Sequence, residues 1–337
     1  MRIRGLGRLR QVWNLVRVPV RRRALILYYH RIAEYETDPF LHCVRPAFFR
    51  EHLHVFRQSY RVIRLDELVN SVEQGDITGP AVAVTFDDGY ADNLWNAVPI
   101  LEEFEVPATI FVTSGWVGME GEALPDVVER CLLTKPEIPT TLELDINGQH
   151  YSWHVGPLTS QDAGWNVRMS AQTPRQTCIS ELGQAIHPLP AAQRAAVLEQ
   201  LMEWAGIPKT ARPERRMLNV SELQAMAEHP LITIGAHTEA HVSLPYLPVE
   251  EQEREIRGSR ETLQKLTGSR IEFFAYPYGN YGSATIECVR RTGFRAAFTT
   301  RPEVVMPHAF QFTLPRRLPR NVGADMFGPW LRRAFLT

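Results

Sequence analysis

The stretch Ala81-Val-Ala-Val-Thr-Phe-Asp-Asp-Gly-Tyr90 decides the fold, because a run of apolar and β-branched residues ends abruptly in two carboxylates and a glycine. The segment 81–87 has the composition and length of a strand buried on both faces. Paired negative charge at the end of such a strand is costly unless something binds there. Much later in the chain, the strand-like Leu231-Ile-Thr-Ile-Gly-Ala236 ends in His237-Thr-Glu-Ala-His241. Each strand end therefore resembles half of a metal site.

Strand-like and helix-like patterns alternate around both motifs. Repeated βα units imply parallel strands with helices outside them, in a barrel or an open sheet. About seven strands are expected, which favours the barrel. We therefore predict an α/β fold with a deformed (β/α)7-type barrel. The expected strands are 24–29, 60–64, 81–87, 107–113, 231–236, 272–276 and 295–300, and the expected helices are 46–58, 65–74, 91–104, 220–229, 248–267 and 283–292.

The segment of about 115–218 breaks this rhythm and is predicted to be a large insertion beside the barrel mouth. Within it, alternating apolar residues over 141–155 flank Asn147-Gly148, a strong β-hairpin signal. Helical patterns follow over 174–187 and 190–205.

The last part of the chain is expected to form a short docked helix that Asp325 could cap. Trp95, inside an expected helix, is interpreted as an ordinary packing residue.

The first 23 residues differ from the rest in charge. They hold eight arginines and no acid, so the formal net charge of −1 leaves 29 basic against 38 acidic residues for the remainder. The basic segment 1–23 is either an amphipathic helix that makes peripheral contact with an anionic membrane or a solvated terminus, and both remain open. Residues 24–337 are predicted to form a single domain. No export signal or membrane span is recognised, so we expect a cytoplasmic protein, with the inner face of the membrane as the alternative.

Four cysteines are scattered without CxxC spacing, namely Cys43, Cys131, Cys178 and Cys288. We expect them to be reduced and buried. No nucleic-acid partner is expected, because no binding motif occurs and basic charge gathers only in the first segment.

Side chains at the carboxyl ends of barrel strands converge on one mouth, so Asp87, Asp88, His237 and His241 can meet there. An Asp-Asp-Gly turn or a single His-x-x-x-His pair is weak taken alone. At the ends of two buried strands, one carboxylate and two imidazoles match a catalytic zinc site, although Co²⁺ and Ni²⁺ accept the same ligands. The second carboxylate could act as a general base.

Thr85-Phe-Asp-Asp-Gly89 and His237-Thr-Glu-Ala-His241 resemble the first two motifs of the NodB-type polysaccharide deacetylases, carbohydrate esterase family 4. The resemblance implies that Asp87 is the general base and that Asp88, His237 and His241 bind the metal. It also implies a metal-dependent hydrolase that removes N-acetyl groups from amino sugars of a polysaccharide or its precursor. The substrate partner would be an N-acetylated saccharide or a lipid-linked saccharide.

A third motif of that family resembles the segment 275–279, Ala-Tyr-Pro-Tyr-Gly. By resemblance, the backbone N–H at Tyr278 would be an oxyanion donor. The family's arginine is replaced by Ala275, so the partner that orients Asp87 must come from elsewhere, and Arg316, Arg317 and Arg320 are the candidates.

The family's late Leu-x-His is not found in its usual place. Leu27-Tyr-Tyr-His30 instead resembles the Tyr-His of members whose motifs are circularly permuted, and His30 becomes the candidate general acid, with a structural histidine as the alternative. Some aromatic residues could offer faces for sugar rings or pack as ordinary core: Trp116, Tyr276, Tyr278 and Tyr281.

Two other functions stay open. The same site could remove a formyl group or hydrolyse another amide. A non-catalytic sugar-binding module is the alternative of a different class, and only the missing arginine favours it.

Overall fold

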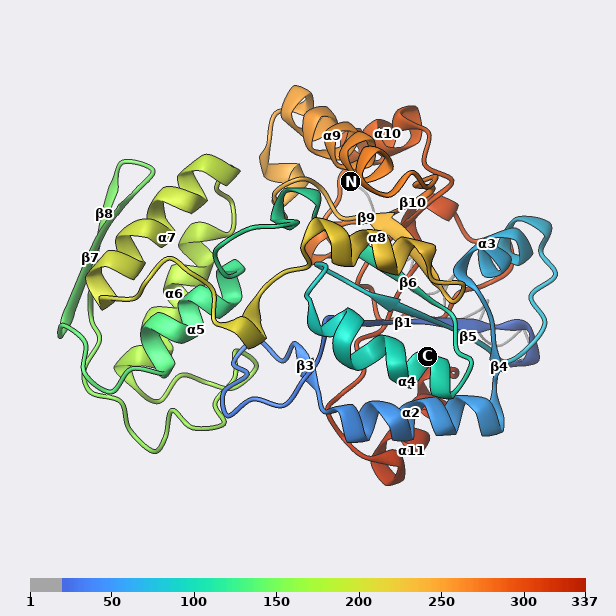
Figure 1. Ribbon diagram of the computed structural model, residues 1–337, viewed down its shortest axis with the longest axis horizontal. Helices are drawn as coiled ribbons and strands as arrows, with labels where there is room; N and C mark the ends of the chain where they lie inside the picture. Colours follow the sequence, from blue (N-terminus) through green and yellow to red (C-terminus); the bar gives the residue numbers. More distant parts are fainter. Residues whose placement is uncertain (1–19) are drawn as a thin grey trace, which may run out of the picture.

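Six parallel strands form the frame of the molecule in the computed structural model, which describes residues 20–337 (Figure 1). They lie in the order β1-β5-β6-β9-β10-β11. Their bounds are Ala24–Tyr29 for β1, Ala81–Phe86 for β5, Ala108–Val112 for β6, Ile232–Ala236 for β9, Phe273–Ala275 for β10 and Ala296–Phe298 for β11. A two-residue strand, β4 (Arg61–Val62), also pairs with the start of β5.

An irregular segment, 314–317, closes the sheet into a ring. The Leu314 amide donates to the carbonyl oxygen of Ala297, on β11. On the other side, the Arg317 amide donates to the carbonyl oxygen of Ile26 on β1, and Tyr28 returns a hydrogen bond to Arg317. The predicted deformed (β/α)7-type barrel is therefore confirmed, with this segment in the place of a regular strand.

Alternate side chains of the strands pack into two different cores. Leu25, Leu27 and Val84 join the core that also holds residues of the surrounding helices. Ala24 and Ile26 belong to the second core, where small and aromatic side chains fill the ring and α3 covers one end. This alternation follows from the twofold period of a strand.

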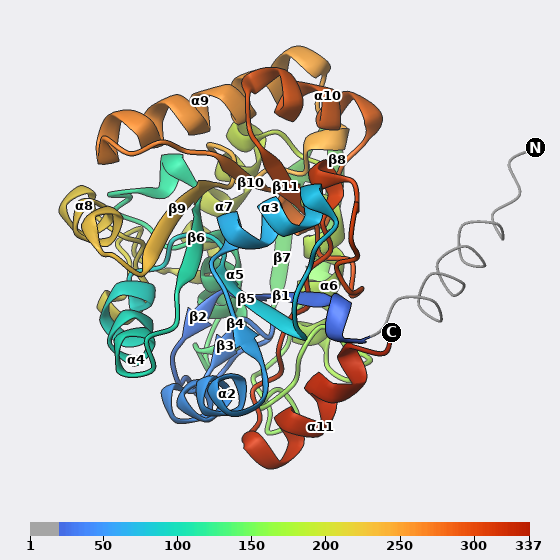
Figure 2. The ribbon, with the colours of Figure 1, turned by 90° about the vertical axis from the view of Figure 1, so that its right-hand side faces the viewer.

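Helices surround the ring, as Figure 2 shows. They are α2 (Pro46–Ser59), α3 (Leu65–Gln74), α4 (Val98–Glu103), α8 (Val220–Glu228), α9 (Val249–Thr267), α10 (Ser283–Thr292) and α11 (Ala324–Ala334). A π-helical turn over Asn93–Ala97 precedes α4, and it leaves Trp95 60% exposed, so the expectation that Trp95 packs in the core is wrong. The terminal helix is present, but its N-cap is Gly323, because the helix begins one residue before Asp325.

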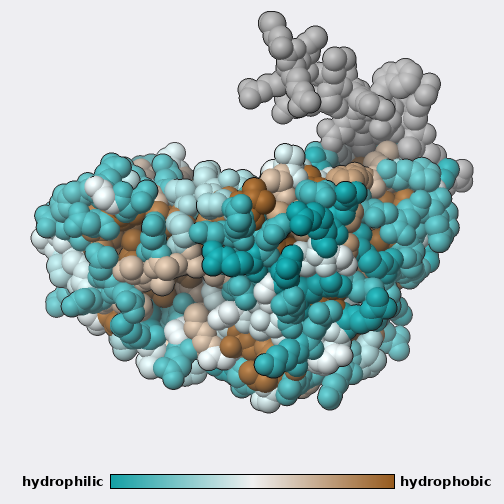
Figure 3. All heavy atoms as spheres, turned by 90° about the horizontal axis from the view of Figure 1, so that it is seen from above, coloured by the Kyte–Doolittle hydropathy of each residue, from teal (hydrophilic) through white to brown (hydrophobic). Residues whose placement is uncertain are grey.

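The insertion forms a lobe beside the barrel, on the left in Figure 1. It comprises α5 (Leu124–Leu133), β7 (Thr141–Ile146), β8 (Gln149–His154), α6 (Pro174–Ile186) and α7 (Ala191–Ala205). These elements share a hydrophobic core of their own. The β7–β8 turn places Asn147 and Gly148 at φ of 51° and 78°, the left-handed values that an Asn-Gly hairpin turn requires. Figure 3 shows a mixed surface, with apolar residues among polar ones over both lobes.

Most of the basic segment 1–23, with its predicted membrane contact, lies outside the described residues. No helix among residues 20–337 is both long and apolar enough to cross a membrane. The cysteines behave as predicted, since all four are free and buried.

Candidate active site

Asp88, His237 and His241 meet where β5 and β9 end. Their potential ligand atoms all lie within 4.8 Å of one another. Asp88 Oδ1 is 3.5 Å from His237 Nε2 and 3.3 Å from His241 Nε2. The three side chains therefore form a group that can hold a metal ion.

The backbone is strained around this group. Asp88 has φ of 76°, and Thr238, His241 and Tyr278 have φ of 64°, 53° and 59°. Half of the eight non-glycine residues with positive φ in the described part of the chain thus lie here. Each such conformation costs of the order of 1–3 kcal/mol and persists only where the surroundings enforce it. The strain is concentrated where side chains must converge.

The polar contacts of the group fit a metal. His237 Nδ1 donates to the carbonyl oxygen of Ala275 at 2.7 Å, which leaves Nε2 free to ligate. Burial lowers the pKa of both His237 and His241, which favours the neutral imidazole that a metal requires. Burial and then the neighbouring Asp87 raise the pKa of Asp88 well above its usual value. Asp88 Oδ1 is buried and has no hydrogen-bond partner among residues 20–337, a costly arrangement that a cation would relieve.

Asp87 is held by a buried arginine. Arg316 Nη1 and Nη2 lie 2.7 Å from Oδ1 and Oδ2 of Asp87, a bidentate pair. Arg316 is fully buried and also donates to Thr85 Oγ1, on the strand that carries Asp87. Among the candidates, Arg316 is thus the partner. Arg317 donates to the side chain of Thr337, and Arg320 is exposed, so neither occupies this position.

A cavity of about 370 Å³ opens over the group. Tyr29 on β1 pairs with Phe86 on β5, so the residues that follow them, His30 and Asp87, leave the sheet at the same edge. His30 therefore lines the cavity. The His30 ring stacks on His42 with centroids 4.3 Å apart, and its Nδ1 has no partner. Burial, and then His42, lower the pKa of His30 well below its usual value. His30 therefore lies in the same cavity as Asp87.

The two residues predicted to contact substrate lie differently. Tyr278 lines the cavity, with its ring centroid 4.7 Å from that of His241. The Trp116 ring lies 5.2 Å from His241 and packs with Tyr90 and Met217. The structure thus places Trp116 beside a metal-binding histidine, where it supports the ring, rather than on the cavity wall.

A buried arginine of the insertion reaches the metal-binding loop. Arg194, on α7, donates from Nη1 to the carbonyl oxygen of His241 at 2.8 Å and to the Tyr278 hydroxyl at 3.2 Å. Its Nη2 donates to the carbonyl oxygens of His187 and Leu189. The insertion thereby fixes the backbone at a metal-binding histidine.

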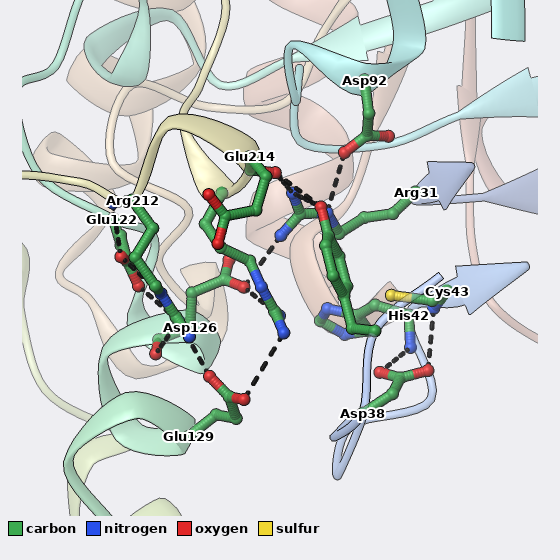
Figure 4. Close-up of polar contacts among 12 residues, drawn as sticks. Arg31, Asp38, His42, Cys43, Asp92, Glu122, Asp126, Glu129, Arg212 and Glu214 are labelled. Carbon is green, nitrogen blue, oxygen red and sulfur yellow. Dashed lines mark hydrogen bonds and ion pairs between the residues drawn. The ribbon is translucent and has the colours of Figure 1, made fainter. Parts of the chain in front are cut away.

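An ion-pair network joins the insertion to the barrel (Figure 4). Arg31, on the short strand β2 (Arg31–Ile32), contacts Asp92 at 2.9 Å and Asp126 of α5 at 2.8 Å. Arg215 also contacts Asp126 at 2.8 Å, and it reaches Glu129. The network continues through Glu122, Arg130 and Arg212. The ion pairs of Arg31 and Arg215 with Asp126 hold α5 against the barrel.

Two residues of the site were not foreseen from the sequence. His42 precedes β3 (Cys43–Val44), and Asp38 accepts hydrogen bonds from the amides of His42 and Cys43. The Asp38 turn was a usable local signal. No signal in the sequence pointed to Arg194, because an arginine on a helix is usually solvated.

Fold and site together define a βα barrel whose cavity holds a paired carboxylate and a group that can bind a metal ion. The family model for polysaccharide deacetylase matches residues 74–137 and 203–297, which include both predicted motifs. Over these two segments the chain resembles the polysaccharide deacetylases.

Known proteins resemble the chain over different lengths. YxkH of Bacillus subtilis (strain 168), classed with the polysaccharide deacetylases, is 25% identical over 115 residues, which are 34% of this chain and 41% of YxkH. The chain thus matches less than half of that relative. The Streptococcus pyogenes deacetylase PplD in complex with acetate is 17% identical, with a TM-score of 0.58 over 93% of this chain and 98% of PplD. IcaB from Ammonifex degensii is 18% identical, with a TM-score of 0.57 over 94% and 97%. These two structures share the fold.

Proposed function

We propose that this protein is a metal-dependent hydrolase that removes N-acetyl groups from amino sugars of a polysaccharide or its precursor. One observation carries the proposal: the arginine-held carboxylate of Asp87 shares a cavity with the Asp88, His237 and His241 group. The match to the polysaccharide deacetylase family model supports the same substrate class.

In this proposal, different residues of the cavity carry out different steps of amide hydrolysis. A divalent metal, zinc by preference, held by Asp88, His237 and His241 would polarise the acetyl carbonyl and bring the pKa of a water to roughly 7. Asp87 takes a proton from the attacking water, and the new C–O bond forms as the oxyanion meets the Tyr278 amide. His30 then gives a proton to the amine as the C–N bond breaks, releasing acetate and a free amino sugar.

Arg316 and His30 support catalysis over simple sugar binding. The missing arginine at Ala275 was the feature that favoured a non-catalytic module, and Arg316 provides a guanidinium for Asp87 from another segment. His30 lies in the same cavity as Asp87 and offers a proton donor that a sugar-binding module would not need.

The test uses the full-length, metal-loaded protein and measures acetate release from N-acetylated amino-sugar chains. Asp87→Asn is expected to lower turnover by roughly 10²–10⁴-fold, the usual worth of a general base. Its metal content is expected to stay at the wild-type level, whereas His237→Ala loses the metal. Asp145→Asn, exposed on β7, is the control. Wild-type turnover in Asp87→Asn would contradict the proposal, and formyl release without acetate release would redirect it to a deformylase.

The cytoplasmic location, the contact with the inner membrane face and a lipid-linked substrate remain predictions. Fractionation of the full chain beside a chain lacking residues 1–23 tests the first two. Loss of membrane association on truncation would support them, and an unchanged soluble fraction would count against membrane contact.

A further inference from the structure

A second hollow, of about 490 Å³, adjoins the active-site cavity on the side of the insertion. Both hollows are lined by Phe40, Gly183 and His187, so they adjoin at these three residues. Seven of the nine residues that line the second hollow lie between the two segments that the family model matches, and four of these belong to α6. It is therefore a feature of the insertion of this chain.

Gly183 lies at the junction of the two hollows, within α6. Glycine is unfavourable inside a helix, so its presence there calls for a cause. Left-handed backbone is not the cause, because Gly183 is not among the positive-φ glycines. Crowding is not the cause either, because a Cβ atom added at Gly183 would meet no atom of the described residues within 4 Å. The place of a side chain at Gly183 is therefore open space at the edge of both hollows.

The walls of the second hollow are amphipathic. Val167 and Pro188 offer apolar surface, and Ser180 and Gln184 offer hydrogen-bonding groups. Tyr246 is 59% exposed at the rim. Such walls suit a pyranose ring, which has C–H faces for aromatic contact and hydroxyl groups at its edge.

The Tyr246 ring is already held in place without a ligand. It meets the His187 ring edge to face, with centroids 5.6 Å apart and planes at 83°. His187 in turn contacts the Tyr278 ring in the active-site cavity, at 4.5 Å. A row of three rings thus leads from the metal-binding group to the second hollow.

We propose that the second hollow binds the sugar residue next to the one that is deacetylated, and that Gly183 is the specificity-determining position that lets a chain extend across α6. This inference rests on the proposed function, since it assumes that the reacting sugar occupies the cavity over Asp88. It makes the protein selective for oligomers over single amino sugars.

The test compares a chain of four N-acetylglucosamine units with the single sugar. Gly183→Leu fills this open space and is expected to lower the ratio of kcat/KM for the tetramer to that for the monomer roughly tenfold, through KM. Gly183→Ala adds only a methyl group and is expected to change the ratio less. Both variants should melt at a higher temperature than the wild type, which separates blocking from unfolding. Gln200→Leu places the same side chain on an exposed part of α7 and should keep the wild-type ratio.

Tyr246→Ala supplies an independent readout, with a fall in tetramer preference expected from the lost ring contact. An unchanged ratio in both Gly183→Leu and Tyr246→Ala would overturn the inference. So would a selective loss of activity toward a dodecyl glycoside of N-acetylglucosamine with the tetramer unaffected, since that outcome would assign the hollow to an apolar chain.

Failure of the proposed function has a different signature, namely no acetate release from any substrate by the wild type. In that case, calorimetric binding of the tetramer to the metal-loaded wild type and to Gly183→Leu still tests the hollow. Weaker binding by the variant supports the inference, and equal affinity or no binding to either protein overturns it.

Discussion

The guanidinium of Arg316 faces the carboxylate of Asp87 with both terminal nitrogens 2.7 Å from the two oxygens, and both residues are buried. The pair fixes the plane of the Asp87 carboxylate and leaves it beside Asp88. Arg316 reaches this position because segment 314–317 closes the ring between β11 and β1. Closure of the barrel and orientation of the proposed base therefore depend on the same few residues.

Replacing Arg316 by lysine keeps the charge and loses the bidentate geometry. We expect Arg316→Lys to lower turnover by roughly 10–100-fold while the protein retains its metal, as is usual for groups that orient a site. Acetate release and elemental analysis check both parts. Arg317→Lys is the matched control, because Arg317 is the next residue and contacts Thr337 instead. Equal losses in the two variants would show that general disruption of the segment, and not the Asp87 contact, is responsible.

The Arg194 contact with His241 predicts that the insertion contributes to metal affinity. Arg194→Gln removes the charge and most donors, and we expect affinity for the metal to fall by roughly 10–100-fold. Competition with a chromophoric chelator measures it.

Arg175 provides the comparison for Arg194. It is also a buried arginine that donates to carbonyl oxygens, but its acceptors, Gly156, Leu132, Lys135 and Pro136, all lie within the insertion. We expect Arg175→Gln to destabilise the lobe while folded protein keeps wild-type metal affinity. If both variants bound metal as the wild type does, the insertion would have no part in holding the metal loop.

Local pattern predicted much of this structure, and the reason is visible in β5. Its six buried residues, followed by Asp87 and Asp88, predict both the strand and the site from local sequence alone. No knowledge of distant contacts is needed. The partner of Asp87 depended on ring closure by segment 314–317, which contains a proline and has no strand pattern, so the sequence could offer Arg316 only together with Arg317 and Arg320.

The helix α5 escaped prediction for a related reason. It buries Asp126 and Glu129 in the ion-pair network, which reverses the usual link between polarity and exposure. Its amphipathic pattern is understandable only once Arg31 and Arg215 are in place. The buried ion pairs of Asp126 and Glu129 thus break the apolar periodicity by which α5 could have been predicted.

His52 predicts acid sensitivity. It is fully buried between the Tyr29 hydroxyl and the Val322 carbonyl oxygen, and burial lowers its pKa to about 4. The unfolded chain takes up a proton near pH 6.5 while the folded protein does not, so stability falls as the pH drops from about 6.5 to 4, by up to about 3 kcal/mol. Urea unfolding across this range measures the fall.

A substitution at His52 isolates its share of this pH dependence. His52→Gln removes the titrating ring and should flatten the curve between these pH values, whatever its effect on stability at pH 7. His54→Gln, on the exposed side of the same helix, should leave the curve parallel to that of the wild type. Parallel curves for wild type and His52→Gln would assign the acid sensitivity to other groups.

The network in Figure 4 predicts that one carboxylate holds the insertion on the barrel. Asp126 Oδ1 accepts from Arg31 Nη1 and Arg215 Nη1, both at 2.8 Å, so Asp126→Asn leaves two buried guanidiniums short of negative charge. Breaking a buried pair in this way costs about 3–5 kcal/mol, and urea unfolding should show a loss of that order. Glu34→Gln breaks an ion pair with Arg45 in which both side chains are about half exposed, and it should cost less than about 1 kcal/mol. Similar small losses for both variants would mean that hydrophobic contact alone secures the lobe.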